Sequence, residues 1–173
     1  LYLNEHREYG LSTYSKHSDG SGVAISSRLR PILNMRPKYR HWLSPSLWQL
    51  NADLHLTDWL EEKNLDFDVV TDEDLHIEGV DMLNRYRCVL TGSHPEYSSE
   101  KMLAAYESYQ LNGGRWIYLG SDGFYWISEY HPDNPNIIEV RKGEAGTRAW
   151  TANPGEYNNA FDGKYGGMWR ARG

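Results

Sequence analysis

The segment RCVLTGSHPEYSSEKMLAAYESYQLNGGRWIYL (Arg87–Leu119) decides the fold class of this chain. Its two ends, Arg87–Thr91 and Arg115–Leu119, are short apolar runs that are typical of buried strands. Between them, Ser98 or Ser99 can cap a helix whose apolar and aromatic side chains recur every three or four residues, and a glycine pair ends that helix. The connection is long enough for one crossover helix, so the segment predicts a parallel βαβ unit.

Further elements flank this unit on both sides. Asn51 can cap a helix over residues 52–63, and the run Phe67–Thr71 is rich in strand-forming residues. Ile137–Arg141 predicts another strand. Because short strands alternate with helices, we predict an α/β domain built on a three-layer parallel sheet.

This predicted core covers residues 51–142. Residues 1–50 lack sustained periodicity, and residues 143–173 are rich in glycine and aromatic residues. We expect both segments to be irregular. The sequence starts at Leu1 rather than Met and stops at Gly173 with no sign of a terminal helix, so we expect a piece of a longer protein, on which residues 143–173 pack.

The composition restricts the function classes. The 173 residues carry a net charge of −6, and no basic stripe is present to neutralise phosphates, which argues against a nucleic-acid partner. No apolar stretch reaches the ~18 residues of a membrane span, and the single cysteine, Cys88, permits no internal disulfide, so we predict a cytoplasmic protein. The 13 Tyr and 7 Trp, against 3 Phe, favour a polar cavity or an interface over a dry aliphatic core.

Polar residues follow the predicted strands, where ligands bind in open parallel sheets. His94 and Glu96 flank Pro95 after the second strand, and Asp122 follows the third. The prolyl ring stiffens the turn, so an imidazole and a carboxylate can be presented at one edge of the sheet. After the first strand, residues 72–76 also carry carboxylates, for which helix capping is the simpler interpretation.

The N-terminal loop around Tyr14 continues into His17–Gly22 (HSDGSG), where Asp19-Gly20 is a turn signal. It lacks the glycine and lysine pattern of a phosphate-binding loop. Cys88 lies at the start of an apolar strand, which favours an inert packed thiol over a nucleophile. His6, His41, His55 and His131 show no metal-ligand spacing and are assigned to surface or packing roles.

Several runs resemble the large (beta) subunit of N,N-dimethylformamidase and its relatives, in order along nearly the whole chain. They are HSDGSG (17–22), SSRLRPILNMRP (26–37), ADLHLTDWLE (52–61), VLTGSHPEY (89–97), LGSDGFYW (119–126), and GTRAW (146–150) with PGEY (154–157). The large subunits of that family are several times longer than this chain, which agrees with the expectation of a fragment.

The resemblance implies an iron-dependent amide hydrolase with an α/β domain resembling the class I glutamine amidotransferase-like fold. The family holds a mononuclear iron with two tyrosinates and one glutamate. Glu96 matches the glutamate ligand, Tyr14 is the position assigned to one tyrosine ligand, and His94 matches an active-site histidine. The second tyrosine and a further catalytic glutamate are expected outside this chain, and a small subunit and an oligomer are implied as partners.

One position departs from the family pattern. Asp122 stands where relatives commonly have Asn in the run before Phe-Tyr-Trp. An amide can donate a hydrogen bond to a substrate carbonyl, whereas a carboxylate cannot unless it is protonated. Asp122 is therefore expected to contact a small amide substrate other than dimethylformamide itself, such as one with a donor or a positive charge.

Two other function classes stay open on the sequence. A non-catalytic carbohydrate- or protein-binding module on the same scaffold would also use Trp and Tyr in glycine-rich loops. Thiol-dependent amidotransferase chemistry would depend on Cys88 alone.

Overall fold

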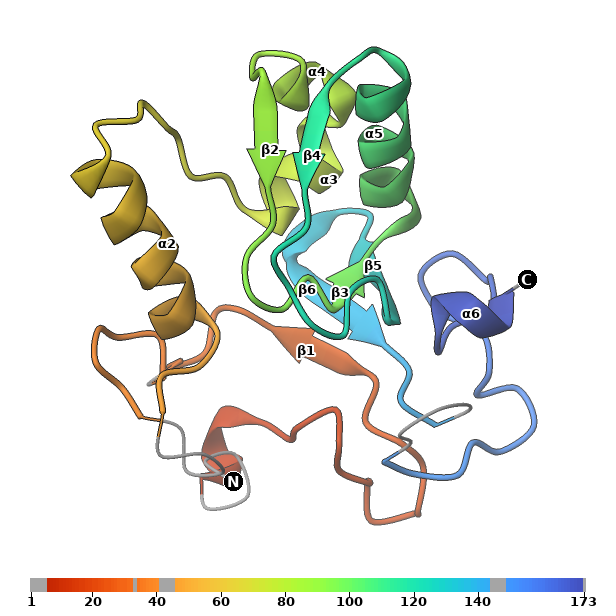
Figure 1. Ribbon diagram of the computed structural model, residues 1–173. Helices are drawn as coiled ribbons and strands as arrows, with labels where there is room; N and C mark the ends of the chain where they lie inside the picture. Colours follow the sequence, from red (N-terminus) through yellow and green to blue (C-terminus); the bar gives the residue numbers. More distant parts are fainter. Residues whose placement is uncertain (1–5, 33, 41–45, 144–148, 173) are drawn as a thin grey trace. The chain divides into compact units, whose positions relative to one another are not determined.

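The computed structural model describes residues 6–32, 34–40, 46–143 and 149–172 (Figure 1). His41 and the first three residues of the Gly146–Trp150 motif lie outside the described residues. The chain divides into two compact units. We call Leu1–Pro31, Glu96–Leu103 and Phe124–Gly173 the mixed-sheet unit, and Ile32–Pro95 with Ala104–Gly123 the parallel-pair unit.

The predicted βαβ element forms, and both of its strands belong to the parallel-pair unit. Strand β2 (Cys88–Leu90) pairs in parallel with β4 (Arg115–Ile117), and the crossover between them contains α5 (Glu100–Leu111), which runs alongside β4 in Figure 1. The Tyr106 ring of α5 packs edge-on against Trp116 of β4, with 4.2 Å between the ring centroids. These contacts confirm the α/β class.

The helix α5 begins where the sequence predicts. Ser99 is fully buried, and its hydroxyl accepts a hydrogen bond from the Met102 backbone N–H at 3.3 Å. At the other end, the Gly114 N–H donates to the Tyr109 carbonyl, and Gly113 adopts a φ of +88° that favours glycine. The predictions that a serine caps this helix and that the glycine pair ends it are therefore confirmed.

The other helices of this unit are α2 (Leu50–Glu62), α3 (Asp72–Glu78) and α4 (Val80–Leu83). The prediction that Asn51 caps α2 is wrong. Asn51 lies inside the first turn, is almost fully buried and donates to the Asn34 carbonyl at 3.5 Å. The capping interpretation of the acidic loop is confirmed at α3, where Thr71 and Asp74 form a reciprocal capping box.

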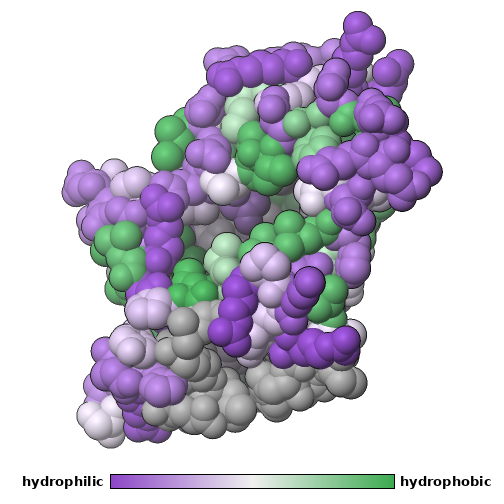
Figure 2. Space-filling model, turned by 90° about the vertical axis from the view of Figure 1, so that its left-hand side faces the viewer, coloured by the Kyte–Doolittle hydropathy of each residue, from purple (hydrophilic) through white to green (hydrophobic). Residues whose placement is uncertain are grey.

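The predicted strand over residues 67–71 is absent. This segment is an irregular connection between α2 and α3, and Val69 and Val70 are 75% and 42% exposed. Strand propensity requires a neighbouring strand and a packed face, and this run has neither in the described chain. Figure 2 shows such apolar side chains at the surface among polar ones.

The mixed-sheet unit contains four strands in the order β1-β6-β5-β3. They are β1 (Ile25–Ser27), β3 (Tyr97–Ser98), β5 (Trp126–His131) and β6 (Asn134–Val140), and only the β3–β5 pair is parallel. The strand predicted over 137–141 is therefore present, but it forms an antiparallel hairpin with β5. Two short helices, η1 (Arg7–Tyr9) and α6 (Trp169–Arg172), complete the unit.

The core of this unit is small and aromatic. Trp126, Val140 and Met168 are buried against one another, with Tyr97 and Tyr125 packed around them. No helix of the described residues has the length and apolar character needed to cross a membrane.

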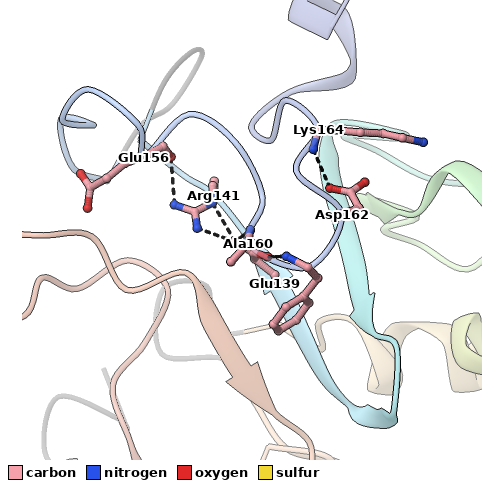
Figure 3. A network of polar contacts seen from close by, with 7 residues as sticks. Glu139, Arg141, Glu156, Ala160, Asp162 and Lys164 are labelled. Atoms are coloured by element: carbon pink, nitrogen blue, oxygen red, sulfur yellow. Dashed lines mark hydrogen bonds and ion pairs between the residues drawn. The ribbon is translucent and has the colours of Figure 1, made fainter.

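A buried ion pair fastens the C-terminal loop to β6 (Figure 3). The Glu139 carboxylate is fully buried, and it accepts hydrogen bonds from the Ala160 and Phe161 backbone N–H groups and from Arg141. Arg141 in turn donates to the Glu156 carbonyl at 2.9 Å. One buried carboxylate therefore accepts hydrogen bonds from three donors, two of them in the C-terminal loop.

Replacing Glu139 by Gln should loosen this loop, because the Arg141 guanidinium loses its counter-charge and one backbone N–H loses an acceptor. Removal of one partner of a buried pair costs about 3 kcal/mol or more. Hydrogen exchange of the Ala160 and Phe161 amides measures the local opening. The matched control is Glu100→Gln, since Glu100 forms exposed pairs with Lys164 and Arg172 and should change stability by less than ~1 kcal/mol. Equal effects of the two changes would contradict the assignment.

Candidate active site

Two tyrosine hydroxyls meet at one lysine in the mixed-sheet unit. Lys142 Nζ donates a hydrogen bond to Tyr14 Oη at 2.7 Å and another to Tyr97 Oη. The Lys142 side chain is fully buried, and its ammonium also lies 3.9 Å from the Tyr14 ring centroid and 4.9 Å from that of Trp126. An ammonium in a cage of aromatic rings is stabilised by cation–π attraction. The predicted residue Tyr14 therefore lies in a polar aromatic cluster.

Trp150 holds the backbone next to Tyr14. Its indole Nε1 donates to the Thr13 carbonyl at 3.3 Å. A Cβ at Gly22 or at Gly143 would come within 2.1 Å of the indole ring, so the ring fits only because both positions lack side chains. The Gly22 of the HSDGSG run is thus explained by packing against Trp150.

The HSDGSG run itself forms a tight turn. The Asp19 carboxylate accepts from the Ser21 backbone N–H at 2.9 Å and from its hydroxyl at 2.6 Å, and these bonds lower the pKa of Asp19. His17 and Ser21 pair through the backbone, and Val23 donates to the Ser15 carbonyl. The predicted turn is confirmed, and it leads the chain directly back past Tyr14.

Glu96 lies immediately before β3. Its backbone carbonyl accepts from the Tyr125 and Trp126 N–H groups at 3.0 and 2.9 Å, which fixes the start of the parallel β3–β5 pair. Its carboxylate acts electrostatically on Tyr97 and on Lys142. Tyr14 and Glu96, the two predicted ligands, are thus both linked to Lys142 within one unit.

Burial sets the protonation of this cluster. Desolvation lowers the pKa of Lys142 to about 8, and the Glu96 carboxylate acts in the opposite direction. Burial raises the pKa of Tyr97 well above its ordinary value, with the charges of Glu96 and Tyr14 adding to this. At neutral pH the cluster therefore holds an ammonium beside a neutral Tyr97 hydroxyl.

His94 and Asp122 belong to the parallel-pair unit, on loops that run side by side after β2 and β4. The Ser121 N–H donates to the Ser93 carbonyl at 2.9 Å, and the Leu119 N–H to the Thr91 hydroxyl at 2.9 Å. The prediction that these strand ends bring their loops together is confirmed.

The loop before His94 is held by α2. Asp53 accepts a hydrogen bond from the Ser93 backbone N–H at 2.6 Å. The imidazole of His94 packs on the Trp48 ring at 4.8 Å, and its Nδ1 atom is buried without a hydrogen-bond partner among the described residues. The Nδ1 atom of His94 therefore has hydrogen-bonding capacity for a group outside the described residues.

Asp122 occupies a left-handed turn. Its φ is +51°, and that of Phe124 is +53°. Gly123 between them donates its N–H to the Tyr118 hydroxyl at 3.0 Å and leaves no room for a Cβ against that ring. Asp and Asn tolerate the left-handed region better than most residues, so this turn suits either side chain.

No role in the site was predicted for Lys142 from the sequence. Tyr97 was predicted only as an aromatic side chain next to Glu96. The burial of Lys142 could have been predicted from the alternation of side chains along β6. Ile138, Val140 and Lys142 occupy alternate positions, so a lysine continues a row of core-facing side chains. The glycine that follows it, Gly143, makes room for Trp150.

The remaining candidate residues have local roles. Cys88 is half-buried at the first position of β2, and His131 packs edge-on against Phe161. Within the described part of the chain, no group of three or more His, Cys, Asp or Glu side chains is arranged to bind a metal ion. The predicted ligand set is of a different kind, because it combines a phenol oxygen with a carboxylate. Hard oxygen donors of this kind are compatible with iron.

Comparison with known proteins covers nearly the whole chain. Residues 3–173 match the family described as N,N-dimethylformamidase beta subunit-like, C-terminal. The N,N-dimethylformamidase beta subunit of Paracoccus aminophilus is 52% identical over 164 residues, which are 95% of this chain and 21% of that protein. The beta subunit from Alcaligenes sp is 51% identical over 164 residues, again 95% and 21%. The chain spans about one fifth of the length of these curated relatives.

The packing of Trp150 can be tested at Gly22. Gly22→Ala should destabilise the protein by about 1–3 kcal/mol, because the new methyl group displaces the indole ring. Urea unfolding followed by tryptophan fluorescence measures the change. In a Trp150→Ala background the same substitution should have little effect, since the obstructing ring is gone. An unchanged penalty in that background would show that the ring is not the cause.

Proposed function

The chain belongs to the N,N-dimethylformamidase beta subunit-like family, and from that premise we propose that its parent protein is an iron-dependent amide hydrolase. The reaction would cleave the C–N bond of a small N-substituted amide, such as a formamide, to give an amine and a carboxylic acid. The observation that carries this proposal is the convergence of Tyr14 and Tyr97 on the buried ammonium of Lys142, beside the charge of Glu96.

Tyr14 and Glu96 are the residues proposed to hold the iron. A phenolate and a carboxylate are hard oxygen ligands, and both side chains belong to the same compact unit. The iron would supply Lewis-acid polarisation of the amide carbonyl and a more acidic bound water. The second tyrosine ligand and a further catalytic glutamate are proposed to come from parts of the parent protein outside this chain.

His94 is proposed to carry a proton to the leaving amine nitrogen. An imidazole can donate or accept a proton near pH 7. The Trp48 ring restricts its orientation, and the unpaired Nδ1 atom leaves hydrogen-bonding capacity that the described chain does not use. Both observations support a role for His94 with a group from outside the described residues.

Asp122 is proposed to select the substrate. A carboxylate at this position can accept hydrogen bonds but cannot donate one to the carbonyl oxygen of a tertiary amide. A substrate with an N–H donor or a positive charge would gain an attractive contact. Tyr125 and Trp126 follow directly in the sequence and are proposed to shape an apolar wall for a small substrate.

The architecture of the parent protein follows from the same proposal. The β2–β4 pair with its helices would be part of a larger three-layer parallel sheet of the amidotransferase-like kind, completed by other parts of the parent chain. Residues 143–173 would also contact those parts. The word "beta subunit" in the names of the relatives supports a second, smaller subunit as a partner.

The ligand assignment can be tested at Glu96 in the full-length protein. Glu96→Gln should lower the iron affinity by at least about tenfold, because the amide cannot supply an anionic oxygen. Metal analysis of the purified protein gives the iron content per chain. The control is Glu107→Gln on the exposed face of α5, which should keep the wild-type iron content. Unchanged iron content in Glu96→Gln would remove Glu96 from the ligand set.

The selectivity assignment can be tested with Asp122→Asn. The new amide can donate to a carbonyl oxygen, so kcat/KM for N,N-dimethylformamide should rise by roughly tenfold or more. The control is Asp122→Gly, which keeps the left-handed conformation but has no donor, and should not produce this gain. A similar gain in both variants would mean that removal of the charge alone is responsible.

A further inference from the structure

The starting observation is the degree to which Lys142 is buried. None of its surface is exposed, although lysine is among the residues least often found fully buried. Burial of an ammonium without compensating contacts is strongly unfavourable. The surroundings of Nζ therefore need to explain why a charged side chain stands at this position.

The compensating groups all come from the candidate active site. Two hydroxyl oxygens, of Tyr14 and Tyr97, accept hydrogen bonds from Nζ. The Tyr14, Tyr97 and Trp126 rings surround it at 3.9, 4.6 and 4.9 Å. Of these groups Tyr14 is the most exposed, at 54%. The ammonium thus tethers a largely exposed ring to the core of the sheet.

A purely structural side chain at this position would not need a charge. A neutral chain of similar length, such as methionine, would fill the same volume among three aromatic rings without the desolvation penalty. Unlike an apolar chain, the ammonium donates hydrogen bonds to both the Tyr14 and the Tyr97 hydroxyl. These two bonds distinguish lysine from its apolar substitutes.

We propose that Lys142 is a positioning residue for amide hydrolysis, whose Nζ fixes the Tyr14 oxygen next to the Tyr97 hydroxyl through its two hydrogen bonds. This inference depends on the proposed function, because it takes Tyr14 and Glu96 to be metal ligands. Lys142 acts through them and does not itself contact the metal or the substrate. The two hydrogen bonds determine where the phenol oxygen lies.

The test compares Lys142→Met with Lys101→Met, an exposed lysine of α5, in the full-length protein. Iron affinity should fall by at least about tenfold in Lys142→Met and stay unchanged in Lys101→Met. Hydrogen exchange of residues 12–15 in the metal-free protein should become faster only in Lys142→Met. Wild-type affinity in Lys142→Met would overturn the inference and leave the proposed function standing, whereas wild-type protein that binds no iron would overturn the proposed function first.

A second variant separates charge from packing and applies even where the methionine variant does not fold. Lys142→Ala removes three methylene groups and the ammonium. The space that this leaves has the size of a propylammonium ion. Added propylammonium should restore iron affinity by several-fold or more, and 1-propanol at the same concentration should not. Equal restoration by the alcohol, or none by propylammonium, would overturn the inference.

Discussion

The arrangement of the mixed-sheet unit around Tyr14 depends on one buried ammonium. Lys142 lies two residues after the end of β6, and its Nζ reaches both a loop far upstream in the sequence and the start of β3. Three segments that are distant in the chain therefore meet at a single atom. Such a contact specifies geometry more strictly than apolar packing does, because hydrogen bonds have narrow distance and angle requirements. The Trp150 ring fixes the backbone at Thr13, and Lys142 fixes the side chain that follows it.

Two adjacent cations, the partly buried Arg141 and the fully buried Lys142, have different consequences. Arg141 pairs with the Glu139 carboxylate, so their charges cancel and the pair holds a loop in place. Lys142 is bonded to hydroxyl groups and aromatic rings, which stabilise its charge without removing it. Electrostatic attraction acts over longer distances in a poorly solvated interior than in water. The Lys142 charge therefore also interacts with the Glu96 carboxylate, whereas Arg141 is paired directly with Glu139.

The sequence predicted helix ends and turns better than it predicted which strands pair with one another. Capping and glycine signals located α5, and the parallel orientation of β2 and β4 agrees with the length of the connection between them. Residues 67–71 were predicted wrongly as a strand, because β propensity does not reveal whether a partner strand is present. Tyr14 was placed by resemblance to a family. Lys142 was missed because a lysine near a strand end is normally solvent-exposed, and only its alternation with Val140 indicates otherwise.

The motifs shared with the family divide into two physical kinds. Gly22 is constrained by packing, since any side chain would collide with Trp150 and shift the backbone next to Tyr14. Asp122 is constrained only by a left-handed turn, which Asp and Asn both tolerate. A change at the first kind of position alters the whole site, and a change at the second alters one polar contact. A departure from the family pattern at Asp122 is therefore compatible with an intact scaffold around Tyr14 and Glu96, and the proposed change in substrate preference would not require loss of the proposed site.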